Sequence, residues 1–104
     1  MSRPARLDDE ALREALCSLP EWRLDEGKLR RDFRFEDFSQ AFAFMTRCAL
    51  VAERLDHHPE WFNVYDRVRV HLVTHDAGGI SELDVELARA MDRFAKPRAR
   101  AKAG

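Results

Sequence analysis

The chain has 104 residues, of which 45% are hydrophobic and 36% are charged, and its formal net charge is −1. This length allows one domain with a single modest core. The nearly balanced charge gives no global attraction to nucleic acid or to a membrane surface, so we expect neither as a partner. No apolar run reaches membrane-spanning length and no signal-peptide region is visible, so we expect a cytoplasmic protein.

The two cysteines and the chain ends show no functional motif. Cys17 and Cys48 lie far apart within helical apolar patterns and form no C-x-x-C pair. They are predicted to be reduced, partly buried thiols. One domain is expected over residues 1–104, with residues 1–6 and the basic tail 97–104 flexible.

The amino-terminal part of the sequence predicts a helix followed by two paired strands. Apolar residues recur with helical spacing over 7–16, and Asp8 is placed to cap that helix. A short strand begins at Trp22, and after a turn the chain returns as a strand over 28–35. Apolar and charged side chains alternate in the return strand, broken only by Arg31, which indicates a half-buried antiparallel strand.

A second, longer helix is predicted from Glu36 or Asp37 to about Leu55. It carries two neighbouring apolar stripes, which are Phe38, Ala41, Phe42, Met45, Ala49 and Ala52 in one and Phe44, Cys48, Val51 and Leu55 in the other. A helix that is apolar over so much of its surface needs more cover than one sheet face supplies. It is either the central core helix of a monomer or, as we rather expect, part of the interface of a homodimer or homotetramer.

Two more strands and a final helix complete the predicted fold. Residues 62–65 and 68–74 have strand patterns, and the glycines of the loop 74–79 permit a close approach of a ligand to the backbone. Ser81 begins the last helix, with Asp84 completing a capping box. The predicted order is α-β-β-α-β-β-α, an α+β domain whose four-stranded antiparallel sheet has its helices on one face.

Candidate proton-transfer residues gather where the second predicted helix ends. His57 and His75 flank a hairpin-sized segment, so antiparallel pairing would bring them to the same edge of the sheet. Two imidazoles beside one pocket can act as acid and base near neutral pH. Glu53, four residues before His57, can orient that ring if helical turns persist so far. Trp61 offers a flat wall for an aromatic substrate.

Simpler interpretations of the same residues stay open. Asp56 is also suited to ending the helix. Trp61 is suited to a place in the core, and Asp84 is suited to capping a helix. His71 has the position of a residue on the sheet surface, and we assign it no role. No Cys/His ligand spacing or H-E-x-x-H motif occurs, so we expect no metal.

The spacing of these residues resembles the signature of the pterin-4a-carbinolamine dehydratases. The matching positions are Glu53, His57, His58, Pro59 and Tyr65, then His75 and Asp84, with flanking agreement in 57–65, 74–76 and 78–79. The resemblance covers essentially the whole chain, and no signature position departs. Some members have Cys where Ala77 stands and Arg where Leu83 stands.

The resemblance implies a hydro-lyase that removes water from 4a-hydroxytetrahydrobiopterin, giving quinonoid dihydropterin in the recycling of tetrahydrobiopterin. The pterin would be the substrate, with no cofactor and no metal, and an aromatic amino-acid hydroxylase would be the functional partner. The implied catalytic residues are His57, His58, His75 and Glu53. The implied substrate contacts are His57, His58, Pro59, Trp61, Thr74, His75, Asp76, Ala77, Asp56 and Asp84.

A function of another class also fits the long helix. Animal members of the family resemble dimerisation cofactors of a homeodomain transcription factor, and some relatives resemble assembly factors. The apolar surface of 38–55 suits such a binding module as well as it suits a homotetramer. The set of His57, His58 and His75 favours the enzyme, because a scaffold does not need three imidazoles at one pocket.

Overall fold

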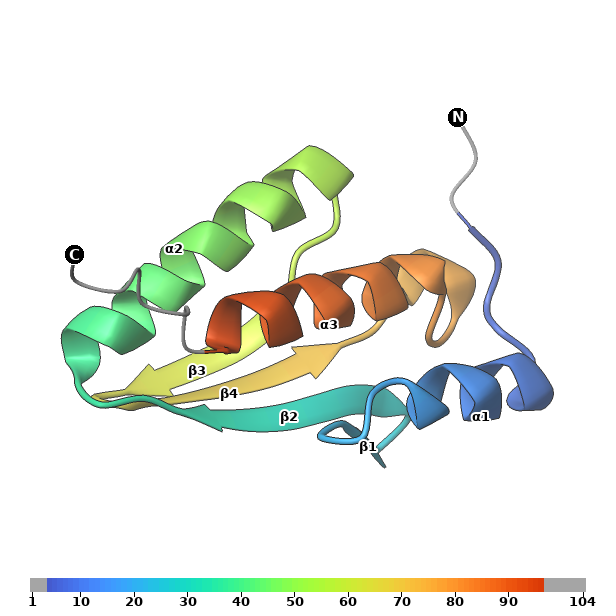
Figure 1. Cartoon of the computed structure of the whole chain (residues 1–104). Helices are drawn as coiled ribbons and strands as arrows, with labels where there is room; N and C mark the ends of the chain where they lie inside the picture. Colours follow the sequence, from blue (N-terminus) through green and yellow to red (C-terminus); the bar gives the residue numbers. More distant parts are fainter. Residues whose placement is uncertain (1–3, 97–104) are drawn as a thin grey trace, which may run out of the picture.

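A computed structural model describes residues 4–96, so most of the residues predicted to be flexible, 1–6 and 97–104, lie outside it. The elements are α1 (Asp9–Cys17), β1 (Arg23–Asp25), β2 (Lys28–Arg34), α2 (Phe38–Leu55), β3 (Glu60–Val64), β4 (Arg67–Leu72), the 3-10 helix η1 (His75–Ala77) and α3 (Glu82–Ala95) (Figure 1). This order confirms the predicted α-β-β-α-β-β-α arrangement. The strand predicted over 68–74 ends earlier, at Leu72, and η1 follows.

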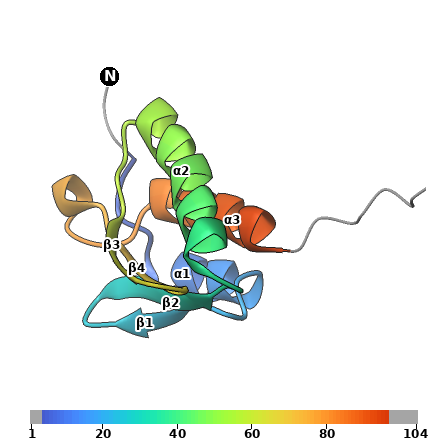
Figure 2. The ribbon, with the colours of Figure 1, turned by 90° about the vertical axis from the view of Figure 1, so that its left-hand side faces the viewer.

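The four strands form one antiparallel sheet in the order β1-β2-β4-β3. Viewed along its edge, the sheet curves around the helices, which all lie on one side of it (Figure 2). The predicted α+β class, with helices on one face, is therefore confirmed. Val68, Val70 and Leu72 of β4 are buried beneath the helices, whereas Arg67 and Arg69 point to the opposite face, as strand alternation requires.

The two hairpin turns use residues with positive φ. Glu26 and Gly27, at φ of 52° and 79°, connect β1 to β2, and this handedness matches the twist of paired strands. Tyr65, at φ 49°, begins the turn between β3 and β4. The Asn63 side-chain amide donates to the carbonyl oxygens of Tyr65 (3.2 Å) and Arg67 (2.8 Å), which holds this less usual turn closed.

The break at Arg31 in the strand alternation has a tertiary cause. Arg31 shares the helix-facing side of β2 with Leu29 and Phe33, and its guanidinium lies 4.2 Å from the centre of the Phe33 ring. The same guanidinium donates to Asp92 Oδ1 of α3 at 2.6 Å, and Trp22 Nε1 donates to that oxygen at 2.8 Å. One carboxylate therefore ties the sheet to α3.

Helix α2 buries neither of its two predicted stripes completely. Asp37 caps it by accepting from the Gln40 backbone N–H, and the buried residues are Ala41, Phe44, Cys48, Val51 and Ala52. Phe38, Phe42 and Leu50 remain 49%, 55% and 67% exposed, and the rings of Phe38 and Phe42 lie 5.6 Å apart. Within residues 4–96, no helix is long and apolar enough to cross a membrane.

The cysteines differ from each other more than predicted. Cys48 is buried in the core, and this burial raises its pKa to about 12. Cys17, at the end of α1, is exposed, so the prediction of two partly buried thiols was wrong. Cys17 lies about 100° around the helix from Leu16, off the stripe that packs on the core.

Asp92→Ala is expected to destabilise the fold by roughly 1–3 kcal/mol, because the part-buried Trp22 and Arg31 donors lose their shared acceptor. Urea unfolding followed by circular dichroism measures the difference. Glu86→Ala, on the exposed side of the same helix, is the matched control and should change the free energy of unfolding by less than about 0.5 kcal/mol. Equal effects of the two substitutions would contradict the conclusion that Asp92 links the sheet to α3.

Candidate active site

The end of α2 turns His57 away from the helix axis. Asp56 adopts the left-handed conformation, at φ 51° and ψ 44°, and the His57 backbone N–H donates to the Ala52 carbonyl at 3.0 Å. This closure is typical of a helix that ends at a left-handed residue. Asp56 therefore does end the helix, and His57 enters the interior, where it is 6% exposed.

Asp84 holds the buried imidazole of His57. Its Oδ1 lies 2.5 Å from His57 Nε2, and its Oδ2 accepts from Thr74 Oγ1 at 2.7 Å and from the Ser81 backbone N–H at 2.9 Å. The Ser81 hydroxyl in turn lies 2.6 Å from Thr74 Oγ1. The predicted capping box is confirmed, and Asp84 combines the cap with a contact to a histidine, two roles that sequence reasoning treated as alternatives.

Glu53 contacts the other histidine of the pair. Its Oε1 lies 2.9 Å from His58 Nε2, so the predicted contact between Glu53 and His57 was wrong. The prediction required helical geometry from residue 53 to residue 57, and the left-handed Asp56 ends that geometry one residue too early. The pair formed by Glu53 and His58 is exposed, unlike the pair at His57.

His75 lies on η1, directly after β4, and its ring contacts β3. Its Nε2 lies 3.1 Å from Glu60 Oε2, while Glu60 Oε1 accepts from Lys28 Nζ at 2.6 Å. The hydrogen bond from Lys28, followed by that from His75, lowers the pKa of the Glu60 carboxyl. Sequence reasoning did not identify Glu60 or Lys28, because no spacing rule relates residues on three separate elements.

A hollow of about 250 Å³ brings the histidines together. It is lined by Asp56, His57, His58, Val73, Thr74, His75 and Asp76. His57 and His75, far apart in the sequence, thus share one cavity at the end of the sheet where α2 ends and β3 begins (Figure 1). It is slightly smaller than the ~300 Å³ at which typical ligand pockets begin.

Other predicted site residues lie outside this lining. Trp61 is half-buried and packs against the core, as its alternative interpretation required, and Asp84 is buried behind His57. Glu53, Pro59 and Ala77 do not line the hollow either. The catalytic role of Glu53 stays a prediction, and so do the substrate contacts of Pro59, Trp61, Ala77 and Asp84. In the described part of the chain, no group of three or more His, Cys, Asp or Glu side chains is placed to hold a metal ion.

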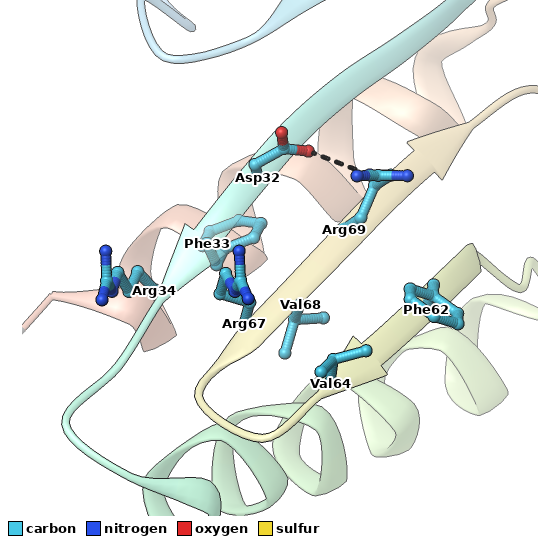
Figure 3. Close-up of a pocket in the computed structure, with 8 residues that line it drawn as sticks. All are labelled: Asp32, Phe33, Arg34, Phe62, Val64, Arg67, Val68 and Arg69. Carbon is cyan, nitrogen blue, oxygen red and sulfur yellow. Dashed lines mark ion pairs between the residues drawn. The ribbon is translucent and has the colours of Figure 1, made fainter.

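A larger hollow, of about 370 Å³, lies along β2, β4 and the end of β3 (Figure 3). It is lined by Asp32, Phe33, Arg34, Phe62, Val64, Arg67, Val68 and Arg69. Its charged groups are arginines and one carboxylate, with Asp32 Oδ1 3.7 Å from Arg69 Nε. None of these side chains exchanges a proton readily near neutral pH, so the smaller histidine hollow is the candidate active site.

Comparisons with known proteins point to a single family. The family model described as pterin 4 alpha carbinolamine dehydratase matches residues 5–94. A protein of Novosphingobium aromaticivorans, provisionally named a pterin-4-alpha-carbinolamine dehydratase, is 59% identical over 92 residues, covering 86% of this chain and 96% of that protein. A provisionally named counterpart of Bradyrhizobium diazoefficiens is 56% identical over 93 residues, covering 88% of this chain and 93% of that protein.

The crystal structure of a transcriptional coactivator/pterin dehydratase from Brucella melitensis has the same fold. The two chains superpose with a TM-score of 0.84 and are 49% identical, over 88% of this chain and 99% of the other. The similarity therefore extends over most of this chain and nearly all of the other.

Asp84→Ala is expected to destabilise the protein by at least about 2 kcal/mol, because three buried donors lose their acceptor. Chemical unfolding measures the loss. Asp76→Ala, which removes an exposed carboxylate from the same hollow, is the control and should leave stability within about 0.5 kcal/mol. A similarly small effect of Asp84→Ala would show that Asp84 does not hold the site together.

Proposed function

Because the chain belongs to the pterin 4 alpha carbinolamine dehydratase family, we propose that it removes water from a 4a-hydroxylated tetrahydropterin in the hollow between His57 and His75. The observation that carries the mechanism is that both imidazoles line this one cavity. Imidazole is the side chain whose ordinary pKa is closest to neutrality, so such a pair can both donate and accept protons at physiological pH.

The reaction requires two proton movements and no change of oxidation state. The bond between C4a and the hydroxyl oxygen breaks while a double bond forms between C4a and N5. A proton delivered to the departing hydroxyl makes it leave as water, and the proton on N5 is removed. We assign these two transfers to His57 and His75, one to each ring. His75 is 74% exposed at its side chain, so it can exchange its proton with solvent between turnovers.

The remaining residues of the hollow hold the rings and the substrate. Asp84 fixes the plane of the His57 ring, and Glu53 contacts His58, which we propose as an auxiliary pterin contact. Asp56 and Asp76 bring carboxylates to the lining, suited to the nitrogen-rich edge of a pterin. The proposed substrate is 4a-hydroxytetrahydrobiopterin, released by an aromatic amino-acid hydroxylase in cofactor recycling in the cytoplasm.

His57→Ala and His75→Ala should each reduce kcat by about 10²-fold or more, since each removes one proton-transfer group. The absorbance change of a freshly generated 4a-carbinolamine pterin, recorded by stopped flow, measures turnover. His71→Ala removes a histidine that is bonded to Asp25 and lies outside the hollow, so it serves as the matched control with kcat changed by less than about 3-fold. Undiminished turnover in a folded double variant of His57 and His75 would contradict the proposal.

We further propose that the chain self-associates through the exposed stripe of α2. Phe38 and Phe42 form an aromatic pair on the outside of the helix, and Leu50 continues the apolar surface toward its end. Large apolar side chains exposed side by side on one helix favour cover by another protein surface. A second copy of the chain presents the same stripe and can cover it symmetrically, as in most homo-oligomers.

Phe42→Glu is expected to shift the protein to the monomer, because a carboxylate at the centre of the stripe is costly to bury. Size-exclusion chromatography with light scattering measures the mass at about 10 μM. Gln40→Glu, an added charge at an exposed position about 160° around the same helix from Phe42, should leave the mass unchanged. A wild-type protein that is already monomeric would rule out the self-association, and the stripe would then be available to a different protein, as in the alternative binding role.

A further inference from the structure

We propose that Glu60 is a positioning residue for His75 and that Lys28 holds Glu60 in place, an inference that rests on the proposed role of His75. Glu60 does not line the hollow, so it acts through the histidine. Three elements meet in this arrangement: Lys28 begins β2, Glu60 begins β3 and His75 begins η1.

The sheet topology makes this contact possible. β4 lies between β2 and β3, and β4 runs antiparallel to both. The first residues of β2 and β3 therefore lie at the same end of the sheet. At this end β4 stops and the chain continues into η1. Lys28 Nζ spans the intervening strand to reach Glu60 Oε1 at 2.6 Å, and Glu60 Oε2 lies 3.1 Å from His75 Nε2.

The charge of Glu60 determines which nitrogen of His75 carries hydrogen. The hydrogen bonds from Lys28 and His75 lower the pKa of Glu60 from its ordinary value of 4.5, so the carboxylate is ionised throughout the neutral range. An ionised carboxylate only accepts hydrogen bonds, and therefore His75 Nε2 must be the donor. In the neutral ring this leaves Nδ1 without hydrogen, so Nδ1 is the atom that exchanges a proton with the substrate.

The contact contributes to orientation much more than to stability. The His75 side chain is 74% exposed and that of Glu60 is 43% exposed, and ion pairs at such exposure contribute little to folding. The contribution of the Glu60 carboxylate is present above pH 4.5 and is lost as the pH falls through the lowered pKa. Titration of Glu60 therefore does not limit turnover between pH 5 and pH 8.

The test compares Glu60→Ala, Glu60→Gln and Lys28→Met in the full-length protein. Nitrogen NMR of the histidine side chains reports the tautomer of neutral His75 without any substrate. We expect the Nε2–H form of His75 in the wild type and a mixture of tautomers in Glu60→Ala. In Glu60→Gln we expect the Nε2–H form to be partly retained, because the amide oxygen still accepts a hydrogen bond from Nε2. Lys28→Met should weaken the preference in the same direction. Asp25→Asn, which removes the carboxylate bonded to His71 on the same sheet, is the matched control and should leave His75 unchanged.

The kinetic readout separates positioning from substrate binding. Glu60→Ala should lower kcat by about 10-fold, as is typical for loss of a group that orients a reactive histidine, with KM changed by less than about 2-fold. A His75 tautomer that is the same in wild type and Glu60→Ala would overturn the inference, and so would a rise of KM at constant kcat. If the wild type lacks dehydratase activity, the proposed function fails, and the NMR comparison still decides whether Glu60 positions His75.

Discussion

The buried contact between His57 and Asp84 fixes the geometry on which the candidate site depends. It joins the junction after α2 to the first turn of α3, and Thr74 brings the end of β4 to the same carboxylate. Burying a carboxylate is costly unless its oxygens are well paired, and here both oxygens accept from specific partners. Movement of any one of the three segments would leave a buried polar group unpaired. The segments that carry His57 and His75 are therefore held in one arrangement before any ligand binds.

The fold was predictable from sequence because its signals are local. Alternation in β2, the cap at Asp37 and the capping box from Ser81 to Asp84 each depend on residues a few positions apart. The shared edge for His57 and His75 followed from antiparallel pairing alone. Contacts between elements were not predictable in this way. Glu60 reaches His75 only because β4 ends beside the start of β3, and Arg31 breaks the alternation of β2 because Asp92 lies across the core.

The error at Glu53 shows how one backbone residue redirects the chemistry of a site. Had Asp56 continued the helix, Glu53 and His57 would have formed an exposed pair on its surface. The left-handed Asp56 instead turns His57 into the core toward Asp84 and leaves Glu53 to the exposed His58. All four histidines of the chain contact a carboxylate, yet only the His57 pair is buried. The hollow thus combines one rigidly held imidazole with two that remain in exchange with solvent.

The two functions proposed for α2 depend on different parts of the helix. Its carboxyl end shapes the histidine hollow, whereas Phe38 and Phe42 lie in its first turns, on the outside. Because the apolar stripe and the hollow share no residue here, substitutions can alter association without touching His57 or His75. The proposed association surface and the proposed active site can therefore be tested independently of each other.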